Sequence, residues 1–124
     1  MSKTVLIIGA FDCFNRKDYH LIKEAKKQCL GGKLVVLVYD DYPHYELFGN
    51  FPKQNLQQRV KNLEYFIKSS NMLLGDGNFK SLRKIFPDDD LLFVHYGDDK
   101  EFSGREDLKE LGITIKFIKP YVKA

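Results

Sequence analysis

The sequence predicts a single α/β domain built on a parallel, doubly wound sheet, and two patterns carry this prediction. Short apolar runs alternate along the chain with segments whose apolar residues recur at helical spacing. This alternation is typical of a parallel sheet with helices on both faces, connected by right-handed crossovers. A chain of 124 residues is long enough for one hydrophobic core, so we expect one domain over residues 1–124.

The strands of this sheet are expected at five places. The first, second and fourth are apolar throughout, as expected for strands that are buried on both faces. The last alternates apolar with polar residues, which predicts one wet face and a place toward an edge of the sheet. The expected strands are Val5–Ile8, Leu34–Val38, Met72–Leu74, Leu91–Val94 and Ile113–Phe117.

Amphipathic helices are expected between the strands. The first runs from about Asp18 to Cys29, with Asp18 as its N-cap and Gly31–Gly32 ending it. The segment Tyr39–Lys53 contains two prolines and is expected to be a long loop, a kind of segment that tends to be functional. The further helices are expected at Leu56–Ile67, at Phe79–Ile85 and around Leu108.

Charge and cysteine content exclude several classes of protein. The 20 basic and 17 acidic residues leave a net charge of +3, too small and too evenly mixed for nucleic-acid binding. No apolar run approaches the ~20 residues that span a bilayer, and the first residues do not resemble a secretory signal. Cys13 and Cys29 lack metal-ligand spacing and cannot form a disulfide framework. We therefore expect a soluble cytoplasmic protein that binds neither nucleic acid nor membrane.

Ligands of doubly wound sheets bind at the carboxyl ends of the strands. The loops to examine are therefore those after the first and fourth strands. We expect Gly9, Asp12, Gly97 and Asp98 to converge at one edge of the sheet. The first loop reads Gly9-Ala10-Phe11-Asp12-Cys13-Phe14-Asn15-Arg16-Lys17-Asp18, and the other reads His95-Tyr96-Gly97-Asp98-Asp99.

The first loop resembles the opening of cytidylyltransferase-like nucleotidyltransferases, above all the glycerol-3-phosphate cytidylyltransferases, whose pattern is Gly-Thr-Phe-Asp-x-x-His-x-Gly-His. Three further segments are similar to the family's in the same order, namely Val35–Asp41, Leu56–Arg59 and Phe93–Asp99. The resemblance implies a Rossmann-like sheet with strand order 3-2-1-4-5. It also implies transfer of CMP from CTP to a phosphorylated alcohol such as glycerol 3-phosphate, with Mg²⁺, in a homodimer.

The resemblance also implies two groups of site residues. It implies that Asn15, Lys17 and Asp18 make the catalytic contacts with the triphosphate. The positions that match the family's nucleotide-binding residues are Gly9, Ala10, Phe11, Asp12, Arg59, Gly97, Asp98 and Asp99.

At several positions the chain departs from the family. Asn15 and Asp18 stand where the family has two phosphate-binding histidines, Lys17 replaces the glycine between them, and Ala10 replaces a threonine. The stretch Glu46–Phe48 lacks the family's loop lysine, and the 124 residues contain no Arg-Thr-x-Gly-x-Ser-Thr-Thr segment. Removing one charge-stabilising donor raises a barrier by about 2.7–4 kcal/mol. We therefore expect transferase activity to be lost or altered.

Asp18 has two interpretations. It can cap the helix, with neighbouring basic residues only solvating the loop. Alternatively, Asp12 and Asp18 together hold a Mg²⁺ against the phosphates, with Arg16, Lys17 and Lys53 supplying positive charge. The first is favoured because capping needs no further assumption.

Two histidines remain as weaker candidates. His95 ends a central strand and could contact a ligand or be a hydrogen-bonded core residue. His44 lies in the long loop among Tyr39, Tyr42, Tyr45, Phe48 and Phe51, which could stack on a base or form a protein interface. The chain is thus either a cytidylyltransferase-like nucleotide-binding protein or a pseudoenzyme that binds a protein partner or senses a nucleotide.

Overall fold

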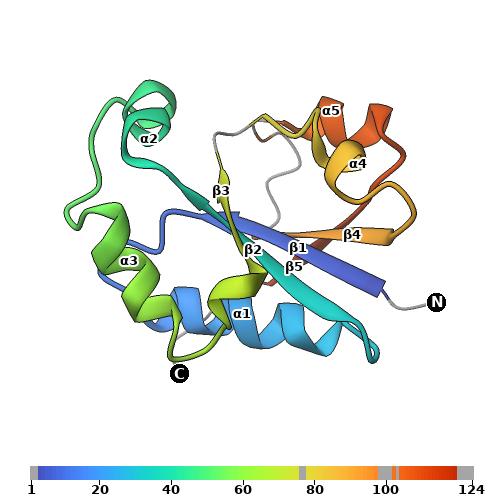
Figure 1. The fold of residues 1–124 in the computed structure, drawn as a ribbon, viewed down its shortest axis with the longest axis horizontal. Helices are drawn as coiled ribbons and strands as arrows, with labels where there is room; N and C mark the ends of the chain where they lie inside the picture. The colour runs from blue at the N-terminus through green and yellow to red at the C-terminus, as the bar shows by residue number, and fades with distance from the viewer. Residues whose placement is uncertain (1–2, 76–77, 98–101, 103, 120–124) are drawn as a thin grey trace.

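A computed structural model describes residues 3–75, 78–97, 102 and 104–119. Its five strands form one sheet in the order β3-β2-β1-β4-β5, and every neighbouring pair is parallel. The predicted fold class, the strand order and the edge position of the last strand are confirmed. The strands are β1 (Lys3–Gly9), β2 (Lys33–Tyr39), β3 (Met72–Gly75), β4 (Asp90–Tyr96) and β5 (Thr114–Ile118) (Figure 1).

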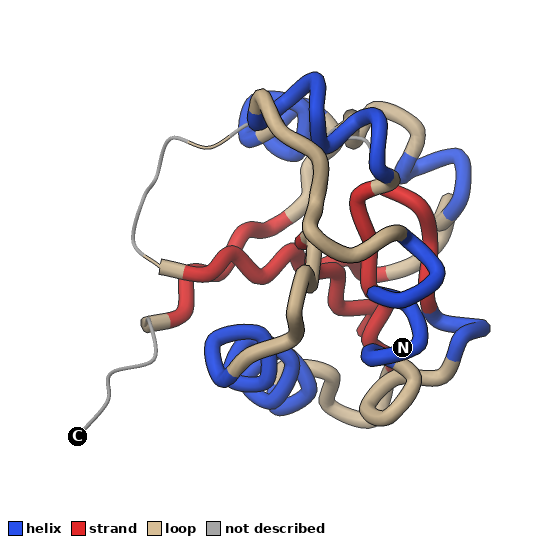
Figure 2. Tube along the Cα trace, turned by 90° about the vertical axis from the view of Figure 1, so that its left-hand side faces the viewer, coloured by secondary structure: helices blue, strands red, loops and turns tan. Residues whose placement is uncertain are grey.

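Helices cover the two faces of this sheet. One layer holds α1 and α3, and the other holds α4 and α5, with α2 above the end of β2 (Figures 1 and 2). The helices are α1 (Arg16–Lys27), α2 (Asp41–Phe48), α3 (Leu56–Leu63), α4 (Leu82–Ile85) and α5 (Arg105–Glu110), with a 3₁₀ helix η1 at Ser69–Asn71.

The core consists of two apolar clusters, one on each face of the sheet. Alternate residues of the central strands face opposite layers, so Ile7 packs toward α1 and α3 while Leu6 packs toward α4 and α5. Both side chains are fully buried. Burial on both faces explains why these strands read as continuous apolar runs.

The start of α1 differs from the prediction. The helix begins at Arg16, and its N-cap is Asn15 rather than Asp18. Asp18 is instead the third helical residue, and its carboxylate accepts the Asn15 N–H while the Asn15 side chain accepts the Asp18 N–H. Asn and Asp are about equally good N-caps, so residue type alone could not choose between them. The reciprocal pair is a capping box, which satisfies two N–H groups at once.

The segment Tyr39–Lys53 is not a continuous loop, because it contains α2. Asp40 caps this helix by accepting the Asp41 N–H, and Gly49 ends it in the left-handed conformation with φ of 80°. Pro43 lies in the first turn, where a missing N–H costs little. Asp40 and Gly49 are both visible in the sequence as helix-end signals, so the prediction of a continuous loop was wrong.

Other helix boundaries shift by up to about four residues, roughly one turn. The helix α1 ends at Lys27 rather than Cys29, and α3 ends at Leu63. Ile67 is buried, but it lies in the turn that follows α3. Within the described part of the chain, no helix is long and apolar enough to cross a membrane.

Candidate functional site

The carboxyl ends of β1, β2 and β4 meet at one edge of the sheet and line a pocket of about 360 Å³. Gly9 and Ala10 continue β1 into this pocket, and Leu21 reaches it from the second turn of α1. The position agrees with the expectation that ligands of doubly wound sheets bind where strands end.

Aromatic side chains form most of the pocket wall. The His95 and Phe102 rings are stacked, with centroids 4.0 Å apart and planes 11° from parallel. On the other side, the Phe48 ring contacts His44 at 4.8 Å and Tyr39 at 5.4 Å between centroids. The rings that line the pocket are Tyr39, His44, Phe48, His95, Tyr96 and Phe102. A cavity walled by rings on two sides is suited to a flat aromatic ligand.

The loop after β1 turns sharply at Phe11 and Cys13, which adopt φ of 54° and 50°. Phe11 is buried in the core layer that faces α1. A Cβ added to Gly9 would lie 3.1 Å from the Phe11 ring, which accounts for a glycine there. Of the predicted nucleotide-binding positions in this loop, Gly9 and Ala10 therefore line the pocket, whereas the Phe11 ring belongs to the core.

Asp12 connects this loop to the segment before α3. Its carboxylate oxygens accept the Lys53 N–H at 2.7 Å and the Gln54 N–H at 2.9 Å. Burial alone would raise the pKa of Asp12, but the two amides and the nearby Arg59 charge outweigh it and lower the pKa. Asp12 is thus held as a carboxylate that joins two loops.

Arg59 connects the backbone segments that form the pocket wall. Its side chain is fully buried and donates to the carbonyl groups of Ala10 at 2.9 Å and Tyr39 at 2.7 Å. It also donates to the Gln54 carbonyl at 3.1 Å and to the Asp41 carboxylate at 2.6 Å. Arg59 does not line the pocket. The structure therefore places this predicted nucleotide-binding residue among the supports of the pocket wall.

The predicted catalytic residues gather at the start of α1, outside the pocket lining. Asn15 and Asp18 bind each other's N–H groups at 3.1 Å, and the Lys17 side chain is exposed. Burial raises the pKa of Asp18, as does the nearby Asp12 charge, although the Asn15 N–H acts in the opposite direction. The carboxylate of Asp18 makes this cluster unfavourable to a phosphate.

Asp12 and Asp18 do not form a ready Mg²⁺ site. Both oxygens of Asp12 accept backbone N–H groups, and one oxygen of Asp18 belongs to the capping box. Among the described residues, no group of three or more His, Cys, Asp or Glu side chains is placed to hold a metal ion.

The loop after β4 is described only in part. Gly97 has φ of 90° and donates its N–H to the Ile118 carbonyl at 2.9 Å. Asp98 and Asp99, two further predicted nucleotide-binding residues, lie outside the described residues. The convergence of Gly9 with the end of β4 is seen in the pocket lining, which includes both Gly9 and Tyr96.

Tyr96 and Phe102 are pocket residues that the sequence pattern did not predict. Tyr39 and Tyr96 both end buried strands and are followed by an aspartate or glycine. An aromatic residue at the carboxyl end of a buried strand was therefore a usable signal for Tyr96. No such signal precedes Phe102, which comes from the segment between β4 and α5.

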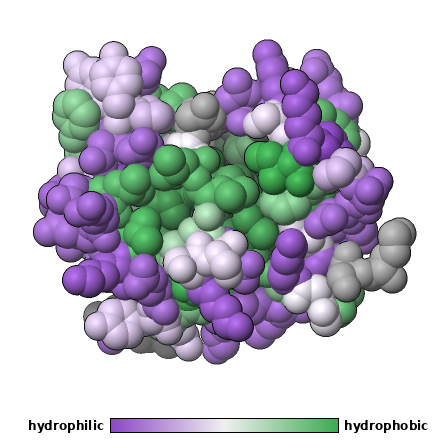
Figure 3. Space-filling view, in the orientation of Figure 1, coloured by the Kyte–Doolittle hydropathy of each residue, from purple (hydrophilic) through white to green (hydrophobic). Residues whose placement is uncertain are grey.

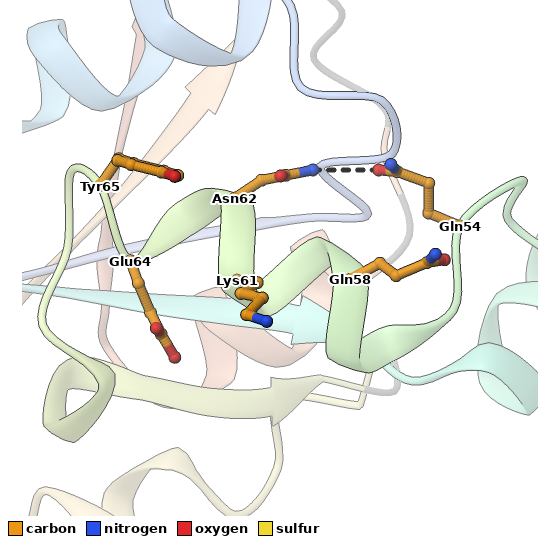
Figure 4. A pocket seen from close by; sticks show the side chains of 6 residues that line it. All are labelled: Gln54, Gln58, Lys61, Asn62, Glu64 and Tyr65. Carbon is orange, nitrogen blue, oxygen red and sulfur yellow. Dashed lines mark hydrogen bonds between the residues drawn. The ribbon is translucent and has the colours of Figure 1, made fainter.

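A second hollow, of about 430 Å³, lies on the surface of α3 (Figure 4). Asn62 points toward Gln54 and donates to its side-chain oxygen at 3.1 Å, whereas Lys61 and Glu64 point away from this pair. Gln54 also accepts the Cys13 N–H at 3.0 Å. The side chains of Gln54 and Asn62 in this hollow are thus used to hold the loop after β1. None of the residues that line the hollow is at the end of a strand. We therefore place the candidate site at the pocket of rings.

Fold and site together define a Rossmann-like α/β domain with a ring-lined pocket at the carboxyl ends of its strands. No family model matches the sequence, and no curated protein matches it. Solved structures do match. A lipopolysaccharide core biosynthesis protein from Thermoplasma volcanium is 25% identical, with a TM-score of 0.69 and 100% coverage of both chains.

Two further structures share the fold at lower identity. A bifunctional NMN adenylyltransferase/ADP ribose pyrophosphatase from Francisella tularensis is 14% identical with a TM-score of 0.64, and the match spans 99% of this chain and 39% of that one. A macrolide-efflux protein from Streptococcus pneumoniae is 16% identical with a TM-score of 0.53, over 99% and 48% of the two chains. The three descriptions name different activities. The likeness therefore establishes the fold, and the activity has to be inferred from the site.

Proposed function

We propose that this chain is a cytidylyltransferase-like nucleotide-binding protein that binds a nucleoside triphosphate, with CTP as the first candidate, in the pocket at the ends of β1, β2 and β4. The observation that carries the proposal is the pocket itself, where rings from α2 and from the end of β4 face a cavity floored by Gly9 and Ala10. Stacking between a base and an aromatic side chain contributes about 1–3 kcal/mol per base.

The triphosphate would extend from this pocket toward the first turn of α1. Leu21 lines the pocket from the second turn of α1, and Ala10 lines it from the loop that leads to the first turn. A helix N-terminus offers N–H groups to an anion. Lys17 and Arg16 add exposed positive charge there, and Mg²⁺ would arrive as the counter-ion of the nucleotide rather than in a site of the protein.

We further propose that transfer of CMP to a phosphorylated alcohol such as glycerol 3-phosphate is lost or very slow. The reaction depends on positioned donors that stabilise charge at the phosphates. Asn15 is a neutral donor whose side-chain oxygen is used in the capping box. Asp18 places a carboxylate where the resembled enzymes have a phosphate-binding histidine. The bound nucleotide then acts as a signal or a stabiliser of the fold.

The proposal is tested by titrating the protein with CTP, ATP, GTP and UTP, each with and without Mg²⁺, by calorimetry. We expect saturable binding of at least one nucleotide. Phe48→Ala removes a ring of the pocket wall and should weaken binding at least about fivefold. Leu47→Ala, the neighbouring residue outside the pocket lining, is the matched control and should leave the affinity unchanged.

A pyrophosphate-release assay with CTP and glycerol 3-phosphate tests the second half of the proposal. We expect no release above the rate without protein. Turnover at an ordinary enzymatic rate, on the order of 1 s⁻¹ or faster, would contradict the loss of transfer.

Two outcomes of the binding titration would contradict the nucleotide pocket. One is that no nucleotide binds, and the other is that Phe48→Ala and Leu47→Ala have equal effects on the affinity.

A further inference from the structure

His44 brings to the pocket of rings a polar atom whose hydrogen-bonding role is fixed by the fold. The residue lies in α2, and its Nδ1 is 2.8 Å from the backbone carbonyl oxygen of Asn50. A carbonyl oxygen only accepts hydrogen bonds, so Nδ1 must carry a proton and donate it. In a neutral imidazole the second nitrogen, Nε2, then has no proton and acts as an acceptor.

The Nε2 atom of His44 is available to a ligand. His44 lines the pocket and Asn50 does not, so the Nδ1 bond is made to a residue outside the lining. The other contacts of the ring are aromatic, with Phe48 at 4.8 Å and Tyr39 at 6.3 Å between centroids. Within the described part of the chain, Nε2 has no hydrogen-bond partner. The pocket therefore offers a ligand one acceptor whose identity is set before the ligand arrives.

The surroundings of His44 are mainly apolar. Figure 3 shows apolar side chains gathered over the sheet next to α2, and Ile8 lines both the pocket of rings and the hollow on this face between α2 and α4. Tyr39 and Tyr96 also line the pocket, but a hydroxyl group can rotate to donate or to accept. It therefore accommodates an amino group and a keto group equally, whereas a fixed acceptor does not.

We propose, on the basis of the nucleotide pocket proposed above, that His44 selects nucleotides by the exocyclic group of the base. Cytosine and adenine carry an amino group where uracil and guanine carry a keto oxygen. The amino group donates a hydrogen bond to Nε2 of His44. A keto oxygen in the same place leaves two acceptors facing each other without a proton, which is costly in a largely apolar cavity. The pocket is thus specific for bases that bear an amino group.

Calorimetric titrations with two pairs of nucleotides, CTP with UTP and ATP with GTP, test this selection at about pH 8, where histidine side chains are ordinarily neutral. In each pair that binds, we expect the amino-bearing member to bind at least about fivefold more tightly. His44→Phe keeps a ring against Phe48 but removes Nε2, so the two affinities should become about equal. A role in packing alone would lower both affinities by the same factor and leave their ratio unchanged.

Two further variants separate Nε2 from the rest of the side chain. His44→Asn retains a donor for the Asn50 carbonyl but places no atom at Nε2, so it should also lose the preference. Tyr45→Phe removes a polar atom from the next residue of α2, which does not line the pocket. It is the matched control and should keep the preference. Circular dichroism checks that each variant is folded.

The outcomes distinguish this inference from the proposed function. Equal binding within each pair, or tighter binding of the keto member, would overturn the role of His44 and leave the nucleotide pocket standing. A preference that survives both His44→Phe and His44→Asn would do the same, because another group would then select the base. If none of the four nucleotides binds to the wild-type protein, both the pocket and the selection by His44 are wrong.

Discussion

At the scale of single residues, Arg59 determines the frame of the candidate site. Its guanidinium is fully buried and donates to the carbonyl groups of Ala10, Tyr39 and Gln54. These carbonyls belong to three segments that are far apart in the sequence, and two of them form the pocket wall. A planar guanidinium can serve several acceptors at fixed angles, which a lysine cannot do.

Replacing Arg59 should therefore destabilise the whole domain. Arg59→Met leaves three backbone carbonyls without this donor, and each buried, unsatisfied group costs about 1–3 kcal/mol. We expect the free energy of unfolding, measured in urea, to fall by about 3 kcal/mol. Lys61→Met, at an exposed residue of the same helix, is the control and should change it by less than about 0.5 kcal/mol. A loss below about 1 kcal/mol for Arg59→Met would show that water or another donor replaces the guanidinium.

At the scale of elements, the start of α1 illustrates how one residue can have two interpretations. Asn15 and Asp18 form a capping box, so both side chains already have a structural role. The raised pKa of Asp18 indicates that burial and the Asp12 charge disfavour its ionised form. The helix macrodipole acts the other way, since it favours a negative charge in the first turn.

Asp18→Asn separates these roles. The Asn oxygen can still accept the Asn15 N–H, so we expect the free energy of unfolding to stay within about 0.5 kcal/mol. Asp18→Ala removes the acceptor and should cost about 1 kcal/mol. If Asp18 only caps the helix, Asp18→Asn should tighten CTP binding, because a negative charge leaves the phosphate side. A Mg²⁺-dependent loss of affinity would instead show that Asp18 holds the metal against the triphosphate, and the loss of transferase function would have to be reconsidered.

At the scale of the whole molecule, the loops that form the site are joined by one carboxylate. Asp12 follows β1, and its partners Lys53 and Gln54 lie between α2 and α3. The lowered pKa of Asp12 makes this connection sensitive to acid. Its contribution to stability is fully present above the ordinary pKa of 3.8 and is lost as the pH falls through the lower value of the folded state.

Asp12→Asn should reduce the free energy of unfolding at pH 7 by about 1–3 kcal/mol, because an amide offers one acceptor where the carboxylate offers two. Below pH 3.8 the difference between the wild type and the variant should shrink. Asp18 contributes with the opposite sign, since its raised pKa adds stability as the pH falls. The stability of the protein with Asp12 and that of the Asp12→Asn variant are therefore compared with both proteins also carrying Asp18→Asn. A difference that does not change between pH 7 and the acid range would show that Asp12 acts without its charge.

The amino-acid sequence by itself determined the fold class, because the strands of a buried parallel sheet are continuous apolar runs. Val5–Ile8, Leu34–Val38 and Leu91–Val94 are such runs, and Thr114 and Lys116 mark the wet face of the edge strand. Glycines and helical spacing between the runs then placed α1, α3, α4 and α5 to within about a turn, whereas α2 was not predicted. The strand order came from the resemblance to a known family, since periodicity does not say which strands are neighbours.

Only the tertiary structure decided which side chains form the site. Phe102 faces His95, Arg59 binds carbonyls from three segments, and Asp12 reaches across to Lys53. None of these contacts is visible as a local pattern, because each joins residues that are brought together only when the sheet forms. The choice of Asn15 over Asp18 as the N-cap is local, but it depended on which residue keeps an extended backbone where the loop leaves the sheet. Local periodicity reports how each segment is buried, whereas the chemistry of the site depends on distances between segments, which only the packed chain determines.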